Sequence, residues 1–124
     1  MVYVLPLAVP VDPTTQEFAT LIERAHGCER QSRRDEARAL YEAALLRLAE
    51  ATAEINASAI VRSIARTHLA DANYDAAREC IELSLTLAEL AGDDAGIGHC
   101  TNQMAVLHWH LGDLDSAKRL YLTA

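Results

Sequence analysis

A short acidic segment recurs three times in this chain at intervals of 40 residues, and this repeat constrains the fold more than any other feature. The three copies are Arg34-Asp35-Glu36-Ala37-Arg38, Tyr74-Asp75-Ala76-Ala77-Arg78 and Leu114-Asp115-Ser116-Ala117-Lys118. The same offset aligns three alanines upstream of the segment, Ala25, Ala65 and Ala105. Downstream it aligns the bulky residues Tyr41, Ile81 and Tyr121. Three residues further on it aligns the small residues Ala44, Ser84 and Ala124. A pattern of small, acidic and bulky apolar positions at one fixed period indicates a single structural unit repeated in tandem.

Each unit is predicted to be helical. No proline follows Pro13, and the rest of the chain is rich in Ala, Leu, Glu and Arg, which are strong helix formers. Thr14 and Glu17 form a capping box beside Pro13, so we expect the first helix to begin there. Apolar residues at helical spacing and intervening turn signals predict six helices, over residues 13–31, 34–53, 56–71, 74–91, 95–111 and 114–124.

Glycine marks two of the predicted turns. Gly92 and Gly112 stand where helix C-termini favour a residue in the left-handed conformation. The first unit has Ser32 at the position of Gly112, so we expect the register of that unit to be looser.

The aligned residues resemble the tetratricopeptide repeat over about residues 16–124. In that family a small residue of the first helix in each hairpin lies against a small residue of the second. This would pair Ala25 with Ala37, Ala65 with Ala77, and Ala105 with Ala117. The third copy, with Leu111-Gly112-Asp113-Leu114-Asp115, matches best. The long period resembles the variant found in bacterial regulators of the maltose-activator type, whereas Cys28, His68 and His108 replace an aromatic residue that is frequent in the family.

The resemblance implies an all-α fold, a right-handed α-α superhelix of about six antiparallel helices in three hairpins. Residues 1–12 would form an extended N-terminal arm, and the repeats would span about 16–55, 56–95 and 96–124, the last incomplete. The arm either frays or lies in a groove of its own chain or of a neighbour. Because no capping helix follows Ala124, we expect either a longer protein or an open end covered by a partner or a second copy.

Charge and composition exclude several function classes. The net charge of −7 argues against nucleic-acid binding, which requires a basic stripe to neutralise phosphates. The three cysteines include no CxxC pair and are odd in number, so we expect a reducing compartment, the cytoplasm. The apolar run over residues 2–11 is short and is interrupted by Pro6 and Pro10, which predicts neither a signal peptide nor a membrane span.

Histidine and cysteine occur close together in three places, but their spacing does not suit a metal. They form His26-Gly27-Cys28, His99-Cys100 and His108-Trp109-His110. Residues one or two apart on a helix point in different directions, whereas helical metal ligands favour a spacing of four. The chain also has no nucleophile motif, glycine-rich phosphate loop or convergent acid pair. We therefore predict no metal, no cofactor and no enzymatic activity.

The stacking that the resemblance implies would line a concave groove with the first helix of each hairpin. The candidate partner-binding residues there are His26, Arg62, Arg66, His99, Asn102 and Trp109. Arg62 and Arg66 lie four apart on one helix face, and a bound carboxylate would relieve their mutual repulsion. Alternatively they are solvated or paired with a glutamate such as Glu29. Trp109 is either a binding hot spot or a packing residue.

These features favour a protein- or peptide-binding adaptor that uses the groove of a helical-repeat array. The expected partner is a protein or peptide, with acidic side chains or a free carboxylate, and self-association through the C-terminal end is a further expectation. The alternative is an oligomerisation or sensory module of a larger bacterial regulator. Neither nucleic acid nor a membrane is an expected partner.

Overall fold

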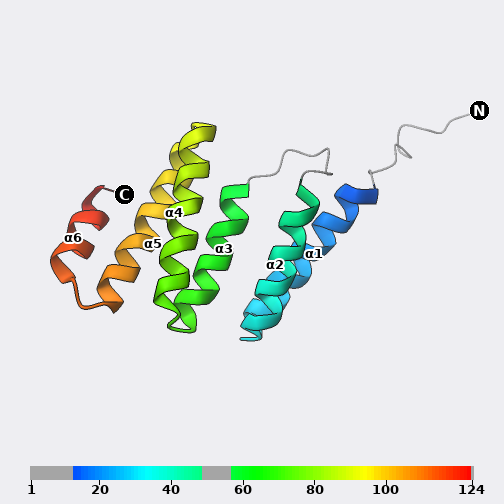
Figure 1. Ribbon diagram of the computed structural model, residues 1–124, viewed down its shortest axis with the longest axis horizontal. Coiled ribbons are helices and arrows are strands. Elements are labelled where there is room, and N and C mark those ends of the chain that lie inside the picture. The colour runs from blue at the N-terminus through cyan, green and yellow to red at the C-terminus, as the bar shows by residue number, and fades with distance from the viewer. Residues whose placement is uncertain (1–12, 49–56, 124) are drawn as a thin grey trace, which may run out of the picture.

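The computed structural model of the protein describes residues 13–48 and 57–123. Its helices are α1 (Pro13–Arg30), α2 (Arg34–Leu48), α3 (Ala57–Ala70), α4 (Tyr74–Ala91), α5 (Asp94–His110) and α6 (Leu114–Thr123). They follow one another in chain order along the long axis of the molecule (Figure 1). The all-α prediction is confirmed, and the expected bounds agree to within one residue wherever they fall in the described part. The arm 1–12, the predicted helix end at 53 and Ala124 lie outside it.

The helices pack as three antiparallel hairpins. In sequence order, α1 packs on α2, α3 on α4 and α5 on α6, and the hairpins join through α2 with α3 and α4 with α5. In addition, α3 contacts α5 directly. No helix in the described ranges is long and apolar enough to cross a bilayer.

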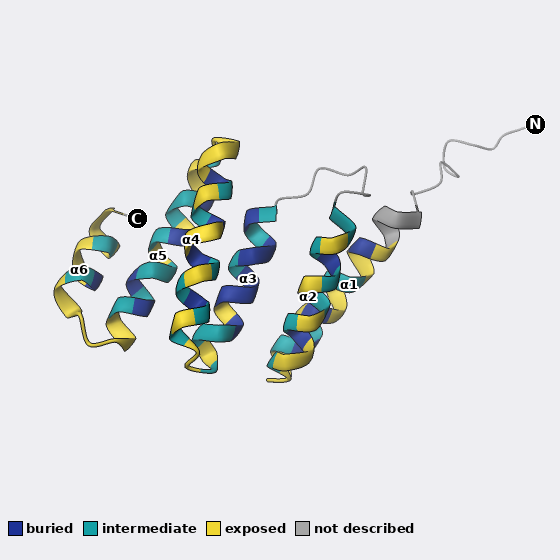
Figure 2. Cartoon of the chain, viewed as in Figure 1, coloured by how far each residue is buried: buried dark blue, intermediate teal, exposed yellow. Residues whose placement is uncertain are grey.

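Small residues occupy the centre of each hairpin, as the repeat alignment predicts. The aligned alanines of the first helices (Ala25, Ala65 and Ala105) and those of the second helices (Ala37, Ala77 and Ala117) are all buried (Figure 2). A methyl group keeps two helix backbones close, and any longer side chain would push them apart. Ser84, aligned with Ala44, is also buried, and its hydroxyl donates to the Ser58 carbonyl oxygen at 2.8 Å.

The bulky position of the repeat forms the core between hairpins. Tyr41 and Ile81 are fully buried: Tyr41 shares an apolar cluster with Ile60 and Ile64 of α3, and Ile81 shares one with Leu107 of α5. The equivalent Tyr121 on α6 is 50% exposed. Burial at this position therefore depends on the first helix of the following hairpin.

The turn inside each hairpin has the same backbone geometry in all three copies. Ser32, Ala72 and Gly112 have left-handed φ angles of 61°, 61° and 82°. One residue later, the backbone N–H groups of Arg33, Asn73 and Asp113 donate to the carbonyl oxygens five residues earlier, at 2.8, 2.9 and 2.9 Å. This is the Schellman ending of a helix. The expectation of a looser first unit is wrong at this turn, since Ser32 adopts the conformation of Ala72 there.

Ion pairs add to the apolar contact between the first two hairpins. Asp71, the first residue after α3, accepts hydrogen bonds from Arg34 and Arg38 of α2, the latter at 2.8 Å. These two guanidinium groups lower the pKa of the Asp71 carboxyl. At the next junction Tyr74, the repeat equivalent of Arg34, instead stacks on His110, with ring centroids 5.6 Å apart.

Candidate partner-binding surface

The six predicted site residues lie on α1, α3 and α5, and we call the surface that they form the first-helix face. They are His26 on α1, Arg62 and Arg66 on α3, and His99, Asn102 and Trp109 on α5. All are exposed except Arg62, which is half-buried. Side-chain hydrogen bonds join α1 to α3 and α3 to α5 along this face. The first helices of successive hairpins are therefore held next to one another.

Arg66 is paired with Glu29 of α1. Its Nη2 and Nε donate to the two Glu29 carboxylate oxygens at 2.9 and 2.5 Å. The Tyr41 hydroxyl donates to the same carboxylate at 2.8 Å. Burial opposes ionisation of Glu29, but the hydrogen bonds from Arg66 and Tyr41 outweigh it and lower the Glu29 pKa. Burial, together with this hydrogen bond, raises the pKa of Tyr41 to about 12.

The predicted arginine pair thus divides between two junctions. Arg66 pairs with Glu29 of α1, which is one of the alternatives that the sequence left open for the two arginines. Arg62 contacts α5 instead, where its backbone oxygen accepts a hydrogen bond from Gln103 Nε2 at 2.9 Å. Sequence reasoning did not identify Gln103, because a single glutamine on a helix carries no signal until its neighbouring helix is placed.

A hollow of about 280 Å³ opens beside the Arg66–Glu29 pair. It is lined by His26, Glu29, Arg30 and Arg66. The ring of His26 meets Tyr41 edge-on, with centroids 5.8 Å apart. Two arginines face a single carboxylate here, so the hollow has an excess of positive charge and of hydrogen-bond donors.

Trp109 lies at the α5 end of the first-helix face. Its side chain is 58% exposed, and its only ring contact among the described residues is an edge contact with the adjacent His110, at 5.3 Å. This exposure argues against packing of Trp109 within its own repeat, whereas contact with a partner and packing for a following helix both stay predictions. His99 and Asn102 are exposed on the same helix.

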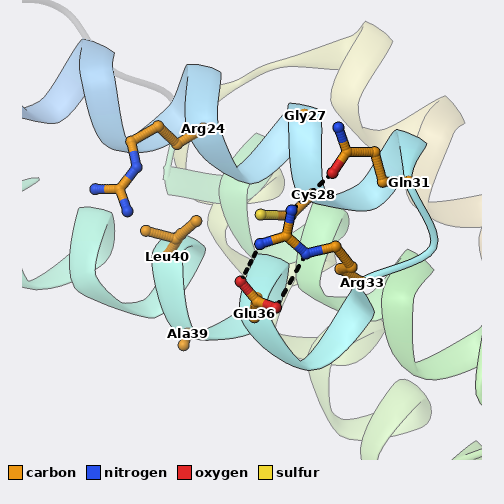
Figure 3. Close-up of a pocket in the computed structure, with 8 residues that line it drawn as sticks. All are labelled: Arg24, Gly27, Cys28, Gln31, Arg33, Glu36, Ala39 and Leu40. Carbon is orange, nitrogen blue, oxygen red and sulfur yellow. Dashed lines mark hydrogen bonds and ion pairs between the residues drawn. The ribbon is translucent and has the colours of Figure 1, made fainter.

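A second hollow, of about 470 Å³, lies between α1 and α2 (Figure 3). Arg24, Gly27, Cys28, Gln31, Arg33, Glu36, Ala39 and Leu40 line it. Arg33 is already engaged there, since it donates to Glu36 at 3.0 Å and to Gln31 at 2.7 Å. The Cys28 thiol is unpaired and buried. This hollow lies on a different side of α1 from the first-helix face.

Metal-ligating side chains are dispersed over the described helices. No group of three or more His, Cys, Asp or Glu residues lies together in this part of the chain. Cys28, Cys80 and Cys100 are free thiols, and burial raises the pKa of Cys80.

Comparison with known proteins identifies the fold. Neither the known protein-family profiles nor the curated proteins provide a match to the chain. Among solved structures, the crystal structure of the TPR domain of Arabidopsis FLU is similar, with a TM-score of 0.78 at 20% sequence identity. The match covers 90% of this chain and 93% of that one. The predicted tetratricopeptide-like solenoid is therefore confirmed as the fold.

Proposed function

We propose that this chain is a protein- or peptide-binding adaptor and that the first-helix face is its binding surface. The observation that supports this is the exposure of basic, amide and aromatic side chains on the first helices of all three hairpins, namely His26, Arg66, His99, Asn102 and Trp109. Tryptophan and arginine are enriched among residues that dominate binding energy. The packed hairpins beneath them supply a rigid support, and rigid side chains lose less entropy when a partner binds.

The hollow beside Arg66 suggests the chemistry of the partner. His26, Arg30 and Arg66 surround the single carboxylate of Glu29, although the chain as a whole carries a net charge of −7. A partner segment with an acidic side chain or a free carboxylate fits this local excess of donors. The free thiols of the described chain suit a reducing setting such as the cytoplasm.

Peptide display on the immobilised chain would test this function. Selected peptides should bind the wild-type chain and lose at least about tenfold in affinity for an Asn102→Ala/Trp109→Ala variant, a typical hot-spot loss. The matched control is Leu83→Ala/Leu90→Ala, which changes two exposed residues of α4. Equal binding to the wild-type chain and the α5 variant would refute the assignment, as would a larger loss in the α4 control.

Self-association through α6 is a second candidate, supported by the exposure of its apolar residues. Leu114, Tyr121 and Leu122 are 60%, 50% and 78% exposed. Clustered apolar surface of this kind marks interaction sites. A chain that pairs through this face would suit an oligomerisation or sensory module of a larger bacterial regulator.

Light scattering coupled to size exclusion would separate the two candidates. Pairing through α6 predicts a concentration-dependent dimer that Tyr121→Glu abolishes and that Leu90→Glu, at an exposed position of α4, leaves intact. A wild-type chain that stays monomeric at every concentration would exclude the second candidate and leave the adaptor proposal in place.

A further inference from the structure

The two ends of the hairpin stack present surfaces that the inner hairpins bury against one another. Within the stack, each second helix packs on the first helix of the next hairpin, α2 on α3 and α4 on α5. The last second helix, α6, lies at one end of the described chain, and the first hairpin lies at the other (Figure 1). Because the units repeat every 40 residues, the exposed residues at both ends have equivalents in the inner junctions.

The hollow between α1 and α2 corresponds to the face through which the second hairpin packs on α2. Three of the residues that line it are Arg24, Gln31 and Leu40 (Figure 3). Their repeat equivalents in the second hairpin are Ile64, Asp71 and Cys80. Ile64 and Cys80 pack in the apolar cluster of the first hairpin, and Asp71 forms the ion pairs with α2. The hollow of about 470 Å³ is therefore the same stacking face, left open.

Gly27 contributes to the depth of this hollow. Its position is occupied by Thr67 in the second hairpin and by Leu107 in the third, and both side chains are fully buried. A Cβ atom added at Gly27 would meet only the end of the Arg30 side chain, at 3.8 Å. The space that Thr67 and Leu107 fill in the inner hairpins is therefore free at Gly27.

α6 presents the opposite half of such a junction. Tyr121 and Lys118 occupy the positions of Tyr41 and Arg38, which pack on the second hairpin and donate to its Asp71. On α6 the same positions are exposed, Tyr121 to 50%, and the neighbouring Leu122 is exposed to 78%. α6 therefore carries the residues of a second helix that packs on a following hairpin.

We propose that α6 of one copy docks in the hollow between α1 and α2 of a second copy, so that copies of the chain join head to tail. This inference rests on the second candidate function, self-association through α6. Transferring the contacts of α2 with the second hairpin to this junction pairs Tyr121 with Arg24, Lys118 with Gln31, and Leu122 with Leu40.

The three pairs are chemically compatible. A guanidinium group stacks on the face of a tyrosine ring, an ammonium group donates to an amide oxygen, and two leucine side chains exclude water from each other. However, Arg24 and Thr20 replace the buried Ile64 and Ile60 of the inner junction. The contact between copies therefore buries less apolar surface than the contact between hairpins, and it should depend on concentration.

The inner junctions favour this arrangement over pairing of α6 with α6. In both of them a second helix packs on a first helix. Pairing of α6 with itself would close at a dimer, because both copies would use the same surface. Head-to-tail joining leaves a free hollow and a free α6 on every assembly, so dimers form first and further copies add as the concentration rises.

Complementation between two variants would test this arrangement by light scattering coupled to size exclusion. Arg24→Glu changes the hollow and Tyr121→Glu changes α6; both positions are exposed, and circular dichroism would verify that both variants fold. Each variant alone should lose at least about tenfold in self-association. An equimolar mixture should form a dimer that grows no further, because it combines one intact hollow with one intact α6. Leu90→Glu, on α4, should associate as the wild-type chain does.

NMR of the mixture would locate the contact. When unlabelled Arg24→Glu is added to isotope-labelled Tyr121→Glu, the backbone amide of Gly27 and the side-chain amide of Gln31 should shift. An Arg24→Glu chain that associates like the wild type, a mixture that stays monomeric, or shifts confined to α6 would overturn the head-to-tail arrangement and leave self-association through α6 in place. A wild-type chain that stays monomeric at every concentration would exclude both.

Discussion

The three hairpin turns provide an internal comparison, because one backbone conformation is occupied by three different residues. Ser32, Ala72 and Gly112 are equivalent in the repeat, and all have positive φ. The left-handed conformation costs a residue with a Cβ atom about 1–2 kcal/mol, and it costs glycine almost nothing. We therefore predict that Ala72→Gly stabilises the fold and that Gly112→Ala destabilises it.

The size of the effect follows from two opposing contributions. Relief of the left-handed strain at Ala72 is worth about 1–2 kcal/mol, while the added freedom of glycine in the unfolded chain costs roughly 0.5–1 kcal/mol. The net gain is about 0.5–1 kcal/mol. A Cβ atom at Gly112 would meet no atom within 4 Å, so the loss there comes from the backbone alone and has a similar size. For 124 residues this corresponds to a shift of about 2–4 °C in melting temperature.

Urea and thermal unfolding followed by circular dichroism would measure both variants. The control is Ala39→Gly, at an exposed interior position of α2, where glycine should lower stability by about 0.5–1 kcal/mol. Because Ala72 has a positive φ, Ala72→Gly should raise the unfolding free energy, whereas Ala39→Gly should lower it. The reasoning would be refuted if both destabilised the chain, or if Gly112→Ala had no effect.

Two further predictions concern the hairpin crossing and the Glu29 pair. Ala77→Leu should overpack the second hairpin and reduce its unfolding free energy by about 1–3 kcal/mol; a change within about 0.5 kcal/mol would contradict a close crossing. Glu29→Gln should destabilise the chain near neutral pH because Arg66 and Tyr41 lose their charged acceptor. Since the folded Glu29 pKa lies below 4.5, the difference from wild type should be complete above that pH and shrink as the pH falls further. A difference that stays constant down to about pH 3 would exclude ionisation of Glu29 as its cause.

Much of the fold could be predicted from the sequence because its determinants are local or periodic. Helix bounds depend on residue propensities and end signals within a few positions. The 40-residue period placed buried alanines such as Ala25 and Ala65 at equivalent points. Ser32 shows the limit of this reasoning, since its side chain gives no sign of a left-handed turn. The surrounding hairpin imposes that conformation through the hydrogen bond from Arg33 to Cys28.

The sequence by itself therefore determined the helices, the repeat and the helices that carry the candidate site. Only the tertiary structure decided how the charged side chains of that site are shared. Arg66 pairs with Glu29 across 37 positions, and Gln103 reaches Arg62 across 41. Arg62 and Arg66 have equal charge and neighbouring places on α3, so nothing local distinguishes them. The stacking of α3 between α1 and α5 distinguishes them. It brings the Glu29 carboxylate to the side chain of Arg66 and the Gln103 amide to the backbone of Arg62.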